Sequence, residues 1–387
     1  MKKCSWVVVS IIILFFIQGQ SQIKKNNNLA EQTVTVDYQM AEKAIEWLEY
    51  IKDEHDLEKI KKYFMTEVAP TEGCQSIIKH WQRFRDWNEE IFFNFIMEAL
   101  NRIPTDKSLK NEDGSQTSFG LRQSLWLDAL NNTGKLRGYL NELREARVKE
   151  AALDLARKYL PEEADISNRF YVVLFGASSA FSVGEENGYD LLQLPKRPDG
   201  EIDVQNVIET FAHEMHHSGF SNCTDKHMSE VKNKERVMLV GILAAEGMPT
   251  HFINRIKENL HWLRSSSNEF SRMLASQWEE NLSRLSQLYQ EAEKDIGLNM
   301  KREIGQKEIF EKWVSGLQGP AYVLGSDMFS VIERYLGLEE AKNVARDYRL
   351  LLSVYNRAAE KARAAGENLF LFDKDLVRRL ENFAGGY

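Results

Sequence analysis

Five residues near the middle of the chain, His213-Glu214-Met215-His216-His217, fit the pattern His-Glu-x-x-His. Residues four apart lie on one face of an α-helix, with Cβ atoms about 5–6 Å apart. Two imidazoles at this spacing can therefore bind one metal ion, at about 2.0–2.1 Å each. The pattern requires a helix here, and it predicts zinc on His213 and His217 with Glu214 placed to act on water.

The surrounding residues supply that helix. Asp203 or Asn206 can cap its start, and Gly219 suits a position just past its end. The two predicted ligands fall on the face opposite the apolar stripe, whereas His216 flanks the stripe and is predicted to pack or to support the ligands. The stripe has the helical period and consists of Val204, Val207, Ile208, Phe211, Ala212 and Met215.

A zinc site needs a third protein ligand, and Glu246 is the candidate that the sequence favours. It is a lone carboxylate in the apolar run Leu243-Ala244-Ala245-Glu246-Gly247-Met248. Burial of a carboxylate is costly unless it is paired or bound to a metal. Gly247, beside it, allows another backbone to approach closely. The alternative explanation for Glu246 is an ion pair with an arginine elsewhere in the chain.

Other side chains near the pattern are weaker candidates for the third ligand. Glu235 lies in a run of charges that is typical of a solvated helix face. His227 and Cys223 lie in polar sequence, and His251 follows Pro249, where a helix is expected to kink or end.

The motif His213-Glu214-x-x-His217, followed by Glu246-Gly247, resembles the glutamate-zincins (gluzincins), metallopeptidases that bind zinc through two histidines and a glutamate. The chain is most similar to uncharacterised bacterial zinc-dependent peptidase families, loosely over residues 35–375 and specifically over 203–250. The resemblance implies one zinc ion per chain on His213, His217 and Glu246, with Glu214 as general base. The thermolysin-like sequence around the third ligand is absent, so the partners of the histidines stay unassigned.

The same resemblance suggests two further features. Tyr322 follows the turn Gly319-Pro320 as tyrosines do in related peptidases, and it is the predicted donor to the oxyanion, although a buried core tyrosine is an equal alternative. In zincins, a strand at the edge of the sheet beside the metal pairs with an extended peptide substrate. A sheet edge without a ligand is the alternative here.

The N-terminus has the features of a secretory signal peptide. Lys2 and Lys3 precede an apolar stretch over residues 6–17, and small residues follow it. We expect cleavage after residue 21 and a secreted or periplasmic protein; the alternative is an uncleaved anchor, the one case in which membrane contact is expected. Cleavage changes the formal net charge from −8 to −10, which argues against nucleic acid as a partner.

The order of helix-like and strand-like segments predicts an α+β protein that is predominantly helical, with a zincin-like core and a small sheet next to the motif helix. Residues 22–34 read as a polar tether, 35–165 as an N-terminal helical region, and 166–387 as the catalytic region with C-terminal helices. Whether the N-terminal region folds alone is left open, as is the oligomeric state. Past residue 21 the cysteines are Cys74 and Cys223, which allow one disulfide or two free thiols.

The expected elements follow from hydrophobic periodicity. Strands are predicted over residues 170–175, 177–183 and 189–194, and residues 104–118 form a loop. Aromatic residues at helical spacing are predicted to form core. Helices are predicted around the stripe of Met40 to Ile51, around that of Ile77 to Trp87, and over 91–103, 121–130, 136–159, 203–218, 237–246, 269–295, 326–336 and 338–363.

The sequence thus favours a secreted zinc metallopeptidase that hydrolyses peptide bonds of a peptide or protein substrate. Two alternatives remain: a catalytically inactive zinc-binding protein and a helical interaction protein of the cell envelope without zinc. The retention of Glu214 argues against the first, because binding alone needs only the ligands. Nothing in the sequence points to a cleavage preference.

Overall fold

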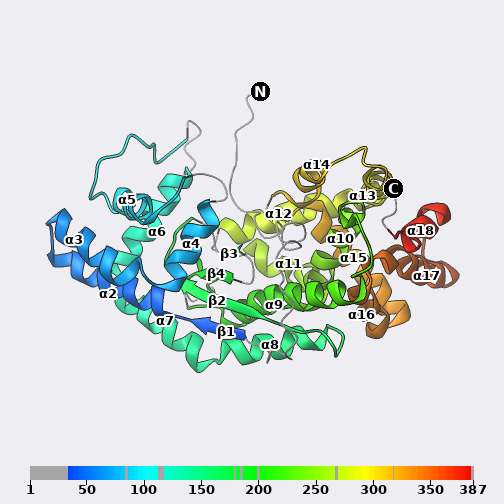
Figure 1. Ribbon diagram of the computed structural model, residues 1–387, viewed down its shortest axis with the longest axis horizontal. Helices are drawn as coiled ribbons and strands as arrows, with labels where there is room; N and C mark the ends of the chain where they lie inside the picture. The colour runs from blue at the N-terminus through cyan, green and yellow to red at the C-terminus, as the bar shows by residue number, and fades with distance from the viewer. Residues whose placement is uncertain are drawn as a thin grey trace.

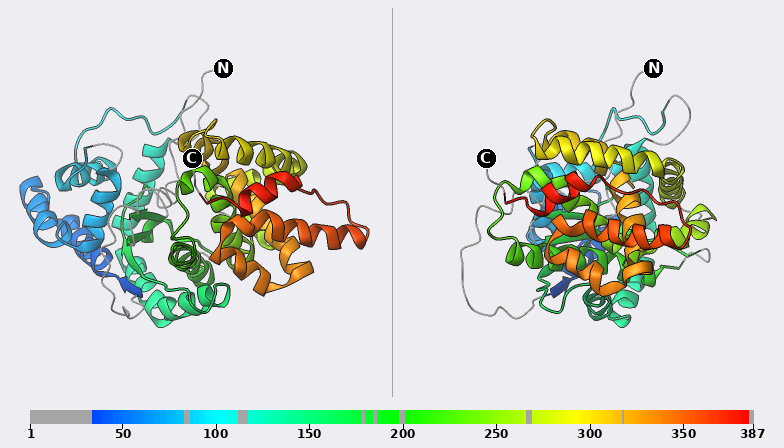
Figure 2. Two further views of the ribbon diagram at one scale, coloured as in Figure 1. Left: turned by 45° about the vertical axis from the view of Figure 1, so that its right-hand side comes forward. Right: turned by 90° about the vertical axis from the view of Figure 1, so that its right-hand side faces the viewer.

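The computed structural model shows a predominantly helical α+β protein, which confirms the predicted fold class (Figure 1). The helices of residues 39–63 lie at one end of the molecule and those of residues 338–381 at the other, with the sheet and the motif helix between them (Figure 2). The residues that the structure describes are 34–82, 86–111, 117–177, 180–183, 186–197, 201–265, 269–316 and 318–384. The predicted signal peptide and nearly all of the tether lie outside them.

One four-stranded sheet contains β1 (Val34–Asp37), β2 (Asn168–Val173), β3 (Ala180–Val183) and β4 (Glu186–Asp190), in the order β1-β2-β4-β3. β1 and β4 are parallel to β2, whereas β3 runs antiparallel to β4. The sequence did not predict β1, which pairs with β2 although more than a hundred residues separate them.

Two predicted strand ends were wrong. β2 stops at Val173, and β4 stops at Asp190 instead of continuing to residue 194. The cause is the buried carboxylate of Asp190, which accepts hydrogen bonds from the backbone N–H groups of Phe175, Gly176 and Leu192. These bonds turn both chain segments out of the sheet, and a 3-10 helix (Leu191–Gln193) follows β4.

The N-terminal region contains seven α-helices among its described residues. The predicted helix over 136–159 is two helices, because the backbone at Arg147 takes a left-handed conformation (φ 50°). Of the aromatic side chains predicted to form core, Trp87, Phe92 and Phe93 are buried, whereas Trp81 and Phe95 are half-buried. The helices are α2 (Gln39–Asp53), α3 (Leu57–Tyr63), α4 (Glu72–Gln82), α5 (Glu89–Ala99), α6 (Ser118–Asn131), α7 (Thr133–Glu145) and α8 (Val148–Lys158).

The C-terminal region differs from the prediction in where its long helices divide. The helix predicted over 269–295 breaks at Arg284, and that over 338–363 breaks at a 3-10 helix (Tyr348–Leu350). The helix predicted from residue 326 begins earlier, at Pro320. The helices are α9 (Val204–His227), α10 (Met238–Pro249), α11 (Ile256–Ser265), α12 (Glu269–Ser283), α13 (Leu285–Met300), α14 (Gln306–Ile309), α15 (Pro320–Leu336), α16 (Leu338–Arg346), α17 (Leu351–Ala364) and α18 (Lys374–Glu381).

The core includes α10, which is buried on every side. The segment Lys234–Asn254, which contains α10, has the length and apolarity of a membrane span, but 89% of its most apolar window is buried within the protein. It is therefore the central helix of the core. α9 packs against the sheet through Phe211, whose ring stacks on Phe170 at 4.5 Å and meets the edge of Tyr189 at 5.2 Å.

Candidate metal centre

Helix α9 carries the motif and is longer than the sequence predicted. Its first turn is capped by Asp203, whose side chain accepts a hydrogen bond from the backbone N–H of Asn206. The helix continues past Gly219 to His227, so the predicted end at Gly219 was wrong. A Cβ atom at Gly219 would lie 2.4 Å from Leu160, so this glycine permits the segment that follows α8 to pack closely on α9.

The structure brings the three predicted ligands together. The rings of His213 and His217 lie 4.6 Å apart, and Glu246 reaches them from α10. The Nε2 atom of His213 lies 3.5 Å from Oε2 of Glu246, and Nε2 of His217 lies 3.3 Å from Oε1. One potential ligand atom from each residue lies within 4.8 Å of the other two.

These distances and the bonding of the three side chains fit a cation. Ligand atoms bound tetrahedrally to zinc at 2.0–2.2 Å lie roughly 3.3–3.6 Å from one another, close to the separations here. Among the described residues, neither Nε2 of His217 nor Oε2 of Glu246 has a hydrogen-bond partner, although both are buried. A metal ion would satisfy both atoms, and a set of two nitrogens and one oxygen suits zinc.

No arginine pairs with Glu246 among the salt bridges of the described residues. Glu246 is buried, with only 2% of its surface exposed. Burial alone would raise its pKa, but the positive charges of His217 and His213 outweigh burial and hold the pKa well below its usual range. The carboxylate is therefore ionised and available as a ligand.

Glu214 lies outside this group of three and is buried, with 8% of its surface exposed. Burial raises the pKa of its carboxyl above the ordinary value, and nearby His217 and His213 oppose the shift. A carboxylate with a raised pKa holds a proton more readily near neutral pH, as a general base must.

Tyr322 lies in the first turn of α15, after Gly319 and Pro320, and is 9% exposed. Burial raises the pKa of its hydroxyl well above the usual range, and the negative charges of Glu246 and Glu214 raise it further. The hydroxyl therefore stays protonated.

Asn254 is a site residue that the sequence analysis missed. Its Oδ1 atom lies 2.5 Å from Nδ1 of His213. When Nδ1–H donates this bond, the lone pair of the same ring is on Nε2, the atom that faces Glu246. Asn254 ends a π-helical turn (Thr250–Asn254) that follows α10 directly, so one stretch of chain supplies both the third predicted ligand and the partner of the first.

The weaker candidates lie elsewhere. Glu235 is in a 3-10 helix (Lys234–Val237) and pairs with Arg302 at 3.5 Å, and His251 pairs with Glu333 at 2.8 Å. His216 is fully buried, as expected for a packing residue.

The two cysteines of the described chain, Cys74 and Cys223, are both free and buried, so they do not form the disulfide that the sequence allowed. Cys223 is part of a separate cluster with His227.

A family model described as "Putative zinc dependent peptidase (DUF5700)" matches residues 65–364. This range contains the motif helix, α10 and Tyr322. No curated protein and no solved structure matches the chain.

Proposed function

Because the chain belongs to this family of putative zinc dependent peptidases, we propose that it is a metallopeptidase of the gluzincin type, with zinc on His213, His217 and Glu246. The observation that carries the proposal is the convergence of both Nε2 atoms on a buried, ionised carboxylate, at 3.5 and 3.3 Å. A zinc ion would replace the charge of the imidazoles as the partner of this carboxylate, and the two imidazoles, neutral once the ion is bound, complete a zinc ligand set with one open position.

The bound zinc would lower the pKa of water to about 7 and polarise the carbonyl of the scissile bond. Glu214 takes a proton from the attacking water and passes it to the leaving amine, a role that its raised pKa suits. Asn254 holds the ring of His213 so that Nε2 faces the centre.

Tyr322 is the proposed donor to the oxyanion of the tetrahedral intermediate. Its pKa, raised by burial and by Glu246 and Glu214, keeps the proton on the hydroxyl. A donor aimed at developing charge in a site that excludes water stabilises the transition state more than the ground state.

The proposed substrate is a peptide in extended conformation. β3 is at one edge of the sheet and pairs with β4 alone among the described strands. The exposed backbone groups of an edge strand are a template for an added strand. We also propose export from the cytoplasm, on the grounds of the signal-peptide features of residues 1–21, with an uncleaved anchor as the alternative.

Metal analysis and cleavage of an unbiased peptide library test the function together. We expect about one zinc at this centre and cleavage by the wild type, while Glu214→Gln keeps the zinc and loses at least about 10²-fold in kcat. Glu230→Gln, the same change on the exposed surface beyond α9, is the control and stays active.

Three outcomes would each contradict part of this proposal. Zinc without cleavage would favour an inactive binding protein, and no zinc in the wild type would favour a helical interaction protein. Wild-type kcat in Glu214→Gln with zinc in place would remove Glu214 as general base.

A further inference from the structure

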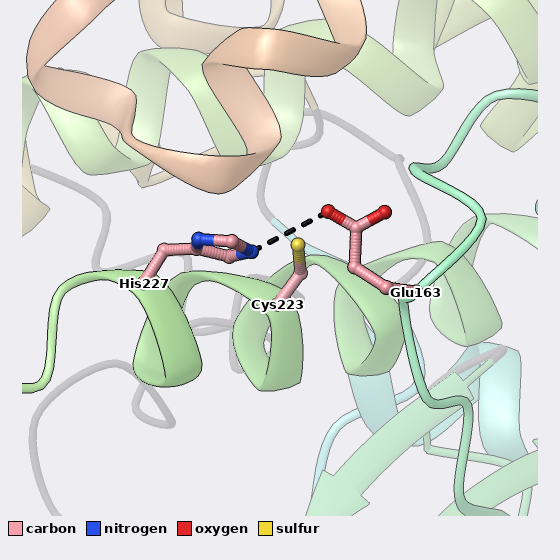
Figure 3. Close-up of side chains that lie close together, drawn as sticks. All are labelled: Glu163, Cys223 and His227. Carbon is pink, nitrogen blue, oxygen red and sulfur yellow. Dashed lines mark ion pairs between the residues drawn. The ribbon is translucent and has the colours of Figure 1, made fainter.

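A second cluster of potential metal ligands lies at the other end of α9. Cys223 and His227 are one helical turn apart, and Glu163 comes from the loop between α8 and β2. Figure 3 shows the three side chains pointing toward one another, with sulfur, nitrogen and oxygen at the centre. Nε2 of His227 lies 3.4 Å from Oε1 of Glu163, and the three potential ligand atoms lie within 4.8 Å of one another.

The spacing and the donor types suit zinc. Cys223 and His227 repeat the four-residue separation of His213 and His217, so both face the same side of α9. Zinc binds thiolate at about 2.3 Å, imidazole at about 2.0–2.1 Å and carboxylate at about 2.0–2.2 Å, which corresponds to donors roughly 3.3–3.8 Å apart. Side-chain movements of about 1 Å would bring the three ligand atoms to these separations. The side chain of His227 is 38% exposed, which leaves a path for the ion and room for a water ligand.

Arg346 also contacts this cluster and must be accounted for. Its Nε and Nη2 atoms donate to Oε1 and Oε2 of Glu163, at 2.5 and 3.0 Å. The pair fixes the carboxylate against α16, and each carboxylate oxygen keeps a second lone pair for another bond. With Cys223 as thiolate, the three ligands carry two negative charges, and the guanidinium neutralises one of them. A divalent cation is therefore still attracted, though less strongly than without the arginine.

We propose that Glu163, Cys223 and His227 form a second zinc site, distinct from the catalytic centre. The loop that holds Glu163 leads into β2 and is already tied to α9, since Ser218 bonds the backbone of Ser167 and Asn222 bonds the carbonyl of Asp165. Zinc at this place fastens the same loop to the C-terminal part of the helix whose N-terminal part carries the catalytic motif. The role of the ion is structural.

Cobalt titration of the full chain separates this site from the first. The double variant His213→Ala/His217→Ala removes two ligands of the catalytic centre and leaves the second cluster intact. We expect it to bind one cobalt ion with the intense near-ultraviolet absorption of a cobalt–thiolate bond, which only a cysteine ligand produces. Adding Cys223→Ser to the double variant abolishes that absorption, whereas adding Cys74→Ala, at the other buried cysteine, preserves it.

Thermal unfolding is a second test of zinc binding at this cluster, and it does not depend on catalysis. Zinc raises the Tm of the double variant by binding the folded state, and it no longer does so after a further His227→Asn change at an exposed ligand. A double variant that binds no cobalt, or binds it without thiolate absorption, would overturn the proposal and leave the cluster as an ion pair with Arg346. Loss of the catalytic zinc in these variants bears only on the first site.

Discussion

Two glycines, Gly247 on α10 and Gly325 on α15, lie against each other where two helices of the candidate metal centre meet. A Cβ atom on Gly247 would lie 2.4 Å from the carbonyl carbon of Gly325 and 2.5 Å from its Cα. A Cβ atom on Gly325 would lie 2.4 Å from the carbonyl oxygen of Leu243. The atoms in the way are backbone, so no side-chain rotation relieves the contact.

Gly247→Ala must therefore push α10 and α15 apart. Ordinary contact begins at about 3.4 Å, so the helices must separate by about 1 Å, which weakens packing along their whole interface. Overpacking of this kind lowers the free energy of unfolding by about 1–3 kcal/mol or more. The better helix propensity of alanine offsets up to about 1 kcal/mol of this loss. We expect a net loss of about 2 kcal/mol. Unfolding entropy is about 2.1 cal/mol/K per residue, so Tm falls by about 3 °C for a folded part of roughly 350 residues.

Scanning calorimetry of the wild type and two variants tests this reasoning. Gly297→Ala is the matched control, because Gly297 lies within α13 and a Cβ atom there would meet nothing within 4 Å. The control keeps or slightly raises Tm, since only helix propensity changes. If Gly247→Ala melts as high as Gly297→Ala, the glycine contact does not constrain the helices. A 1 Å displacement of Tyr322 relative to Glu246 should also lower kcat, by up to about 10²-fold.

Three further predictions concern the candidate metal centre. Asn254→Ala removes the hydrogen bond to His213 and should weaken zinc binding about 10–100-fold in a chelator competition titration; unchanged affinity would refute the positioning role. Tyr322→Phe should lower kcat about 10²-fold with unchanged zinc content, and full activity would leave Tyr322 a core residue. Glu246→Ala should lower zinc content strongly and Glu235→Ala should not; the opposite result would move the third ligand to Glu235.

Hydrophobic periodicity predicted most of the helices, because most of them bury one apolar face. It did not predict where long helices break. Arg147 and Arg284 are neither glycine nor proline, and helical periodicity continues on both sides of each. The breaks depend on which partner each half packs against, and a local pattern does not contain that information.

The sheet was predicted in part, for a related reason. β2 is a run of β-forming residues and stands out in the sequence. β1 has four residues, Val34–Asp37, and becomes a strand only because it pairs with β2, in the register Val36 to Phe170. A parallel pairing between segments so distant leaves no trace in the sequence near either strand.

In the candidate site too, the sequence predicted the residues that a local pattern identifies and missed one that depends on tertiary structure. The positions of His213 and His217 follow from one helix, and the apolar surroundings of Glu246 mark that carboxylate as exceptional. No local feature of the sequence identifies Asn254 as a site residue. Its contact with His213 depends on the π-helical turn after α10, which ends at the left-handed residue Arg255 (φ 49°). No periodicity encodes such a turn.

The role of α10 follows from these contacts. It bears Glu246, the turn that continues it bears Asn254, and Gly247 sets its distance from the helix that bears Tyr322. α9 supplies the two imidazoles, but their orientation and their third partner both depend on the neighbouring helix. A site built this way keeps its geometry because α10 is enclosed on all sides and cannot shift without opening the core. Substitutions in the buried face of α10 that contacts α15 should therefore affect stability and activity together, whereas those at Glu214 or Tyr322 should affect activity first.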